Sequence, residues 1–414
     1  MSHDTLIAEI EAWLLEKALG DPEIVKLFEA LCQRLHAVGV PVERAVMSWP
    51  TLHPLFRAEQ VFWWLGKGAR LEQHYHSSAG SDAWLRSPFY RVLSRALPRL
   101  RRRLTGENAF LDFEVLKDLA GQGYTDYLMT ASNFRIAQFA EYDGGKTGIM
   151  ASWTTTRAGG FTDGDLEALS RIQTVFAVAC RVAIEKRVMA NLATAYLGPT
   201  AGGRVLSGDI KQGDGARIRA VVWFSDMRGS TRLSDEMAPD DYLALLNKYF
   251  ECTAAPVIAH GGEILNFIGD GVLGVFPIAD ADGGPDGAGD AVGRATAAVG
   301  DALRLRGEVI EAGTPAGAPL EFGIGLDIGE LMFGNIGVPD RLAFSGIGRV
   351  VNGTQRIEAA TKDMGCPVLA TAAVAQAMPG AWVPAGQRCM ADFQREVELF
   401  TYRQAVVEDQ RAAE

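Results

Sequence analysis

The chain has 414 residues, a length that favours two domains because one core rarely serves more than about 250–300 residues. Its 40 basic and 51 acidic side chains give a net charge of −11, which disfavours nucleic acid as the main partner. Five scattered cysteines form neither a disulfide framework nor a zinc motif. We find no basic leader and no apolar stretch long enough to span a bilayer, so we expect a cytoplasmic protein.

The first half of the chain combines helical and strand-like patterns. Apolar spacing predicts helices over 5–18 and 22–37, strands around 45–49, 60–65 and 147–155, and a basic helix face at 99–103. A longer helix is expected from residue 163 to about 195, because Thr162 can cap it and Asp165 follows three residues later. This helix would link the two halves of the chain.

Aromatic and histidine residues of the first half allow two interpretations each. Trp63, Trp64 and Trp153 could line a small-molecule pocket, but core packing is the favoured interpretation. His74 and His76 have no third ligand nearby, so we interpret them as structural rather than as metal or haem ligands.

The second half begins at about residue 218, after connectors expected at 200–203 and 213–215. Strands are predicted at 220–224, 263–267, 272–276, 322–328, 331–335 and 341–347, and helices over 240–258, 291–309 and 350–361, with a Gly/Asp-rich loop at 279–290. Gly269-Asp270-Gly271 is typical of a hairpin turn, and Gly329 is expected to separate the fourth and fifth strands. The pattern predicts an α+β domain with one mainly antiparallel sheet and helices on its face.

Asp226 and Asp270 are the most informative residues of the chain. Each follows an apolar strand-like run and lies beside glycine. A single aspartate at a strand end is most often a turn or cap residue, but the two together favour a shared site for hard divalent cations. Two such cations can stabilise the attacking and departing oxygens of a phosphoryl reaction. Gly229, Ser230 and Thr231 open the next helix, where backbone N–H groups can bind phosphate oxygens.

Asn352 and Arg356 form the second candidate set. A spacing of four places both on one face of the predicted helix over 350–361. The guanidinium of Arg356 can bind phosphate oxygens as a fork, and Asn352 can orient a sugar oxygen. An exposed helix face without a function is the simpler interpretation of such a pair. Its position after the glycine-flanked Ser345 favours a functional one.

Four segments of the second half, in this order, resemble the catalytic domain of class III adenylate/guanylate cyclases: VVWFSDMRGSTRLSD, HGGEILNFIGDGVLGVF, GIGLDIGELMFGNIG and RLAFSGIGRVVNGTQRIEAATK. The resemblance covers about residues 217–402 and implies a ferredoxin-like or palm-type sheet. It implies that Asp226 and Asp270, with Met227, hold two Mg²⁺ or Mn²⁺ ions. It further implies that Asn352 and Arg356 stabilise the transition state, and that two chains form a homodimer with the sites at their interface.

The chain departs from the family pattern at the positions that select the base. Where adenylate cyclases usually have a lysine, this chain has Asn266, and its partner position is Ser345. Asparagine both donates and accepts hydrogen bonds, so guanine or a pyrimidine stays open. Adenine is favoured because Ser345 resembles the threonine found in many bacterial adenylate cyclases. Ala391 aligns with a lysine that normally binds the terminal phosphates. Either Arg388 or Arg395 replaces it, or the affinity for the triphosphate is weaker. GGEIL at 261–265 resembles the diguanylate cyclase signature only superficially.

These patterns combine into one prediction with two alternatives. We expect a regulatory domain over 1–190 that vaguely resembles a GAF sensor, a linker over 191–216, and a cyclase domain over 217–405. The predicted reaction is the attack of the ribose 3′-oxygen of ATP on the α-phosphorus, which gives cyclic AMP and pyrophosphate. A small molecule or a protein would provide the signal at the first domain. The alternatives are a guanylate or pyrimidine-nucleotide cyclase, and a weakly catalytic module that binds nucleotide.

Overall fold

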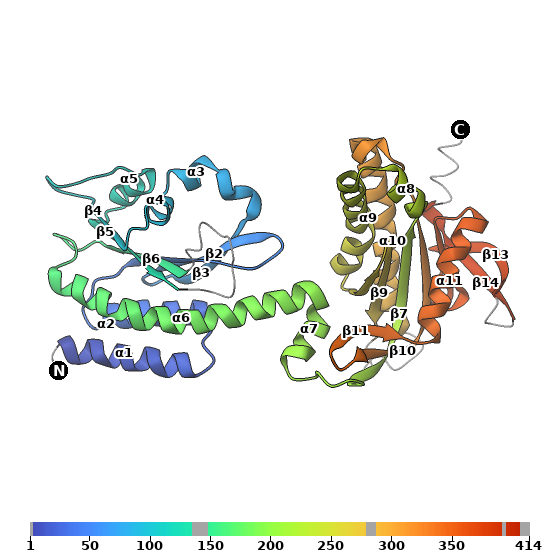
Figure 1. Ribbon diagram of the computed structural model, residues 1–414, viewed down its shortest axis with the longest axis horizontal. Helices are drawn as coiled ribbons and strands as arrows, with labels where there is room; N and C mark the ends of the chain where they lie inside the picture. Colours follow the sequence, from blue (N-terminus) through green and yellow to red (C-terminus); the bar gives the residue numbers. More distant parts are fainter. Residues whose placement is uncertain (1–2, 135–147, 279–286, 391–394, 406–414) are drawn as a thin grey trace. The chain divides into compact units, whose positions relative to one another are not determined.

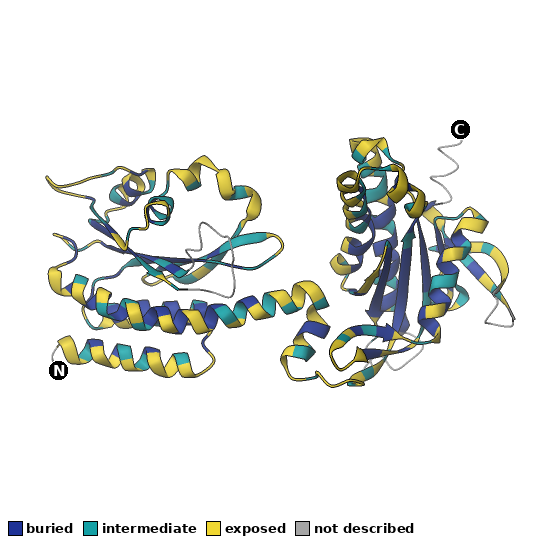
Figure 2. Cartoon of the chain, in the orientation of Figure 1, coloured by how far each residue is buried: buried dark blue, intermediate teal, exposed yellow. Residues whose placement is uncertain are grey.

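The structure is a computed structural model that describes residues 3–134, 148–278, 287–390 and 395–405. It divides into two compact units, Met1–Ala195 and Tyr196–Glu414 (Figure 1). In both units the central strands are mostly buried and the helices bury only their inner faces (Figure 2). Among the described residues, every helix is too short or too polar to cross a membrane.

A six-stranded antiparallel sheet forms the centre of the first unit, with the strand order β3-β2-β1-β6-β5-β4. Its strands are β1 (Arg44–Pro50), β2 (Phe56–Trp64), β3 (Gly68–Tyr75), β4 (Arg99–Arg103), β5 (Asp126–Asn133) and β6 (Gly148–Thr155). One face carries α1 (His3–Leu19), α2 (Ile24–Ala37) and α6 (Asp163–Leu197). The other face carries the short helices α3 (Asp82–Leu85), α4 (Pro88–Ser94) and α5 (Glu114–Gly121) (Figure 1).

Helix α6 begins where the sequence predicted it. The Thr162 hydroxyl accepts a hydrogen bond from the Asp165 backbone N–H at 3.3 Å, and the Asp165 carboxylate accepts one from the Thr162 N–H at 2.6 Å. This reciprocal capping satisfies two N–H groups at the start of the helix. Trp63 and Trp153 are buried in the core beneath α6, which confirms the core interpretation of these two side chains.

The basic segment at Arg99–Arg103 is strand β4, so the prediction of a solvated helix face was wrong. Leu100 is buried, whereas Arg101 and Arg103 both bind the buried carboxylate of Asp126, at 2.6 and 3.3 Å. Residues two apart share one side of a strand, so both guanidinium groups reach the same acid. The strand therefore pairs with β5, a distant segment that a local charge pattern does not reveal.

An eight-stranded sheet forms the centre of the second unit, with the order β13-β14-β12-β10-β7-β9-β8 and with β11 paired to β10. All pairs are antiparallel except β10 with β12. The strands are β7 (Gly215–Met227), β8 (Glu263–Ile268), β9 (Gly271–Pro277), β10 (Phe322–Val338), β11 (Arg341–Ile347), β12 (Val368–Thr371), β13 (Trp382–Met390) and β14 (Arg395–Tyr402).

Helices cover both faces of this second sheet. Helices α9 (Pro239–Ala259) and α10 (Gly287–Ala312) pack on one face, and α11 (Arg349–Met364) packs on the other, as Figure 1 shows. Three shorter helices complete the unit: α7 (Pro199–Leu206), α8 (Ser230–Glu236) and α12 (Ala372–Ala377). The predicted α+β class with a mainly antiparallel sheet is confirmed.

Two local predictions in the second unit were wrong. The expected break at Gly329 does not exist, because Phe322–Val338 is one continuous strand. A Cβ on Gly329 would lie 2.8 Å from the Cβ of Val350, so this glycine lets α11 approach the sheet and does not make a turn. Residues 200–203, expected as a connector, lie within α7, where Pro199 occupies the first turn and buried Ala201 anchors the helix.

Candidate active site

Asp226 and Asp270 lie side by side at one end of the second sheet. Asp226 is near the end of β7, and Asp270 is in the tight turn between β8 and β9. Strands β7 and β9 are neighbours, with Ser225 opposite Val272, so the two aspartates reach the same edge. The pKa of Asp226 rises to about 6, chiefly because of burial and also because of repulsion by, and a hydrogen bond with, the Asp270 carboxyl.

The donor atoms of this pair fit a hard divalent cation. Oδ2 of Asp270 is buried and has no hydrogen-bond partner within the described residues. An unpaired carboxylate oxygen beside a second carboxylate is costly unless a cation neutralises both groups. The Met227 side chain is buried, so this residue offers only its backbone oxygen. No group of three or more Asp, Glu, His or Cys capable of holding a metal occurs in the described ranges.

An ion pair that the sequence analysis missed supports the two aspartates. Arg228 follows β7, and its Nη2 lies 3.1 Å from Oε1 of the buried Glu358 on α11, while it also donates to the Thr361 hydroxyl. Burial raises the pKa of Glu358 to about 7, and Arg228 acts in the opposite direction. Arg228 also lowers the pKa of Asp226, so one guanidinium offsets negative charge on both sides. In the sequence, the position of Arg228 two residues after Asp226 was the signal that could have indicated this role.

Tyrosines of α9 form a second feature that the sequence did not single out. The hydroxyl of Tyr249 is 3.0 Å from the hydroxyl of Ser225, the residue before Asp226. Burial raises the pKa of Tyr242, and the charges of Asp270 and Asp226 raise it further, which places this phenol within electrostatic reach of the pair. Helix α9 therefore contacts β7 at the residue next to Asp226.

The predicted phosphate segment starts α8. Gly229 has φ of +70°, in the left-handed region that glycine adopts without strain, and it turns the chain from β7 into the helix. Ser230 is half-buried and Thr231 is exposed. A phosphate-binding role for the backbone N–H groups of these three residues stays a prediction.

Asn352 and Arg356 both lie on α11, one helical turn apart as predicted. Asn352 is exposed and Arg356 is half-buried. Within the described part of one chain, the Asn352 side chain makes no hydrogen bond. Unlike Asp226 and Asp270, which the fold of a single chain joins, this side chain remains available to a ligand or to a second chain.

The two candidate base-reading residues lie on β8 and β11, which do not pair with each other in the sheet. Asn266 is exposed on β8, and Ser345 is half-buried on β11, opposite Gly334 of β10. Their neighbours Leu265 and Gly346 meet, since a Cβ on Gly346 would lie 2.7 Å from Cδ1 of Leu265. The fold thus brings the segments of Asn266 and Ser345 together, although it does not test what they bind. Ala391 lies outside the described residues.

The chain is similar in sequence to known adenylate cyclases. The chain is 31% identical over 168 residues to an adenylate cyclase of Anabaena cylindrica, a match that covers 40% of this chain and 32% of that protein. It is 30% identical over 162 residues to adenylate cyclase 1 of Rhizobium meliloti, covering 38% of this chain and 23% of that protein. The chain therefore spans about a third or less of the length of these curated relatives. No protein-family model matches the chain.

Two solved structures of bacterial cyclases match parts of the chain. A light-regulated bacterial adenylyl cyclase is 22% identical with a TM-score of 0.44, and the match covers 57% of this chain and 65% of that chain. The adenylyl cyclase CyaB of P. aeruginosa is 27% identical with a TM-score of 0.38, covering 45% of this chain and 95% of that chain. The sequence matches and the four ordered motifs agree: the second half of this chain is similar to class III adenylate/guanylate cyclases.

Proposed function

We propose that this protein converts ATP into cyclic AMP and pyrophosphate at a site that contains Asp226 and Asp270. The observation that carries the proposal is the close pairing of these carboxylates, with the pKa of Asp226 raised to about 6 and one oxygen of Asp270 buried without a partner. Such a pair has little value for stability and suits the binding of divalent cations with a triphosphate. Asp226, Asp270 and the backbone oxygen of Met227 would hold Mg²⁺ or Mn²⁺, two ions per site.

In the proposed reaction, the ribose 3′-oxygen forms a bond to the α-phosphorus while the bond to the β-phosphate oxygen breaks. The hydroxyl proton is lost to solvent, and pyrophosphate leaves. The bound cations supply charge neutralisation for the triphosphate. Arg356 would donate to the phosphoryl oxygens through its fork, Asn352 would orient the ribose, and the N–H groups of residues 229–231 would bind phosphate. Arg228 would act as a positioning residue, because it forms an ion pair with Glu358 and its charge lowers the pKa of Asp226.

A homodimer is part of the proposal. Asn352 is exposed and has no hydrogen-bond partner among the described residues of its own chain, so a second chain can complete the site that contains Asp226 and Asp270. Arg356, one turn further along the same helix, would enter the same shared site. The N-terminal unit, through α6, would then control how two catalytic units meet. Because ATP is an intracellular nucleotide, the proposed reaction would take place in the cytoplasm.

Co-expression of two inactive variants tests the shared site. Asp226→Ala chains keep Arg356, and Arg356→Ala chains keep both aspartates, so a mixed dimer rebuilds one complete site of its two. Random pairing makes half of the dimers mixed, and we expect about a quarter of the wild-type cyclase rate. The control pair, Asp226→Ala with Asp270→Ala, loses the same half of every site and should recover nothing. No recovery in the first pair, from proteins that form mixed dimers, contradicts the shared site.

The choice of base depends on Asn266. Its amide can donate and accept, whereas the lysine usual in adenylate cyclases only donates. We expect Asn266→Lys to raise the ratio of kcat/KM for ATP over GTP by about tenfold or more. The ammonium group of lysine donates hydrogen bonds to the acceptor atoms of adenine, but it cannot accept a hydrogen bond from the N–H groups of guanine. Competition assays with both nucleotides measure this ratio. Asn247→Lys, which places the same charge on the exposed surface of α9, should leave it unchanged.

Asn266 also supports the alternative that the unit binds nucleotide and turns over weakly. Two measurements on one sample separate these functions: ATP affinity by calorimetry, and pyrophosphate release with Mg²⁺ or Mn²⁺. The proposed enzyme releases pyrophosphate in equal amounts with cyclic AMP. ATP binding without release of pyrophosphate would favour the binding module. A guanylate or pyrimidine cyclase would instead release pyrophosphate from a different triphosphate.

A further inference from the structure

A cavity of about 320 Å³ lies in the N-terminal unit, between the sheet and the short helices α3 and α4. Its floor consists of residues of β1, β2, β3, β5 and β6. Ala131 on β5 and Met150 on β6 pack with α4 and α5, so this floor is the face of the sheet opposite α6. A cavity of about 150 Å³ accommodates one benzene ring, so this one has room for a molecule of about two fused rings.

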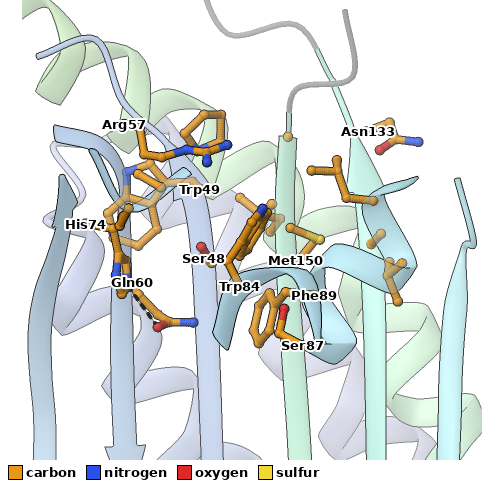
Figure 3. Close-up of a pocket in the computed structure, with 18 of the residues that line it drawn as sticks. Ser48, Trp49, Arg57, Gln60, His74, Trp84, Ser87, Phe89, Asn133 and Met150 are labelled. Carbon is orange, nitrogen blue, oxygen red and sulfur yellow. Dashed lines mark hydrogen bonds between the residues drawn. The ribbon is translucent and has the colours of Figure 1, made fainter. Parts of the chain in front are cut away.

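Three large apolar side chains give the cavity its chemical character. Figure 3 shows Trp84, Phe89 and Met150 gathered around the open space. Each of them is only half-buried, so each presents apolar surface that a ligand can cover. Planar rings pack well against an indole or a phenyl group, and burial of the apolar surface favours binding.

The hydroxyl groups of the cavity already have hydrogen-bond partners within the protein. Ser48 and Ser78 donate to backbone carbonyl oxygens, at 3.3 and 2.7 Å. Ser81 and Ser87 cap α3 and α4 by accepting from backbone N–H groups, at 3.3 and 3.1 Å. These four hydroxyl groups therefore need no ligand to satisfy them.

The larger polar side chains of the cavity disfavour a charged ligand. Oε1 of Gln60 is 3.1 Å from Nε2 of His74, and Arg57 already interacts within the protein, with its guanidinium carbon 5.3 Å from the centre of the Trp84 ring. None of the described lining residues is an aspartate or glutamate, and Asn133 offers a neutral amide. A charged ligand would lose its hydration here without gaining an unengaged opposite charge, which is costly.

We propose that this cavity binds an uncharged, planar compound of about two fused rings, held by apolar contact with Trp84, Phe89 and Met150. The volume sets the size of the ligand, the apolar walls favour flat rings, and the engaged polar groups exclude a net charge. This binding does not depend on what the second unit catalyses.

Strand β5 connects the cavity floor to α6. Ala131 lines the cavity, and its neighbours Thr130 and Ser132 point to the other face of the sheet, because successive side chains of a strand alternate. Gln173 of α6 binds both neighbours: its Oε1 accepts from the Thr130 hydroxyl at 2.9 Å, and its Nε2 donates to the Ser132 hydroxyl at 2.6 Å. A ligand that shifts β5 therefore also shifts groups bonded to α6.

Strand β2 repeats this arrangement with a buried ion pair. Glu59 lies between the cavity residues Ala58 and Gln60 but points to the other face, where it is fully buried. Its two carboxylate oxygens accept from Nε and Nη2 of Arg187 on α6, at 2.5 and 2.7 Å. Such a pair is costly to break, so α6 follows a movement of β2. An effect of the ligand on cyclase rate rests on the proposed function.

Calorimetry on the full chain at pH 7 tests the charge preference with three naphthalene compounds of similar size. These are the neutral 2-naphthol, the anion 2-naphthoate and the cation 2-naphthylmethylammonium. We expect 2-naphthol to bind at least about tenfold more tightly than either ion, because the cavity does not replace the hydration of a charge. An ion that binds as tightly as 2-naphthol, or no binding of 2-naphthol at millimolar concentration, would overturn the proposal.

Two variants that fill the cavity locate the binding. Ala131→Leu and Ala58→Leu enlarge side chains on two different strands of the floor, and each should weaken 2-naphthol binding by at least about tenfold. Ala109→Leu, the same change at an exposed residue outside the cavity, should keep the affinity of the wild type. Circular dichroism verifies the fold of each variant. Wild-type affinity in a folded variant of either cavity alanine would refute the assigned site.

Hydrogen exchange tests the link to α6 without use of the enzymatic activity. Bound 2-naphthol should change the amide exchange rates of α6 around Gln173 and Arg187 by about twofold or more. Unchanged rates in a saturated protein would refute the link. The effect of 2-naphthol on cyclase rate is measured separately, because a chain without cyclase activity still reports binding by calorimetry.

Discussion

Asp270→Asn is expected to abolish cyclase turnover, with a loss of roughly 10³-fold or more in kcat. The amide keeps the size of the carboxylate but removes the charge that a divalent cation requires, and only Asp226 then remains as a charged ligand. Cyclic AMP formation with Mn²⁺ measures the loss. Asp290→Asn, an exposed aspartate on α10 that pairs with Arg294, is the matched control and should retain full activity.

The same variant should not lose stability, and this separates a catalytic defect from misfolding. In the metal-free protein the two carboxylates repel each other, and this repulsion contributes to the raised pKa of Asp226. Removal of one charge relieves the repulsion, so Tm of Asp270→Asn should equal or exceed that of the wild type in buffer with a chelator. A variant with high Tm and normal turnover would show that Asp270 does not hold a required cation.

Arg356→Ala is expected to lower kcat by about 10²-fold or more while KM for ATP changes little. The guanidinium is assigned to charge that develops during the reaction, so its loss weakens the transition state more than the bound ground state. Steady-state kinetics with Mg²⁺ gives both constants. Arg304→Ala, an exposed arginine on α10 paired with Asp301 and Glu308, removes an equal side chain far from α11 and should behave as wild type.

Arg356→Lys refines this prediction. Lysine keeps the charge but lacks the planar fork, so we expect only partial recovery of kcat relative to Arg356→Ala. A large rise in KM with unchanged kcat in both variants would instead indicate ordinary substrate binding. That outcome would contradict the role assigned to Arg356.

The candidate metal pair was predictable because its signal is local. Asp226 ends an apolar run and Asp270 occupies a glycine-flanked turn, and each motif defines its own strand or hairpin. The pairing of β7 with β9 then brings the two carboxylates together. Helix α6 was predictable for the same reason, since Thr162 and Asp165 cap it within four residues of sequence.

Features that depend on distant partners could not be predicted. The strand at Arg99–Arg103 pairs with β5, where Asp126 binds two of its arginines, and Gly329 belongs to a continuous strand that pairs with β7 and packs against Val350. The ion pair of Arg228 with Glu358 joins two segments more than a hundred residues apart. Neither segment has a sequence pattern that predicts its contact with the other. The cavity of the first unit likewise forms from separate strands and two short helices.

Product analysis by mass spectrometry tests the central claim most directly. The purified chain with Mn²⁺ is given ATP, GTP, CTP and UTP in separate reactions, with Asp270→Asn as the control. The account predicts cyclic AMP and an equal amount of pyrophosphate from ATP, and no product from the control. Absence of any cyclic nucleotide from all four triphosphates, in a dimeric protein that binds ATP, would contradict it.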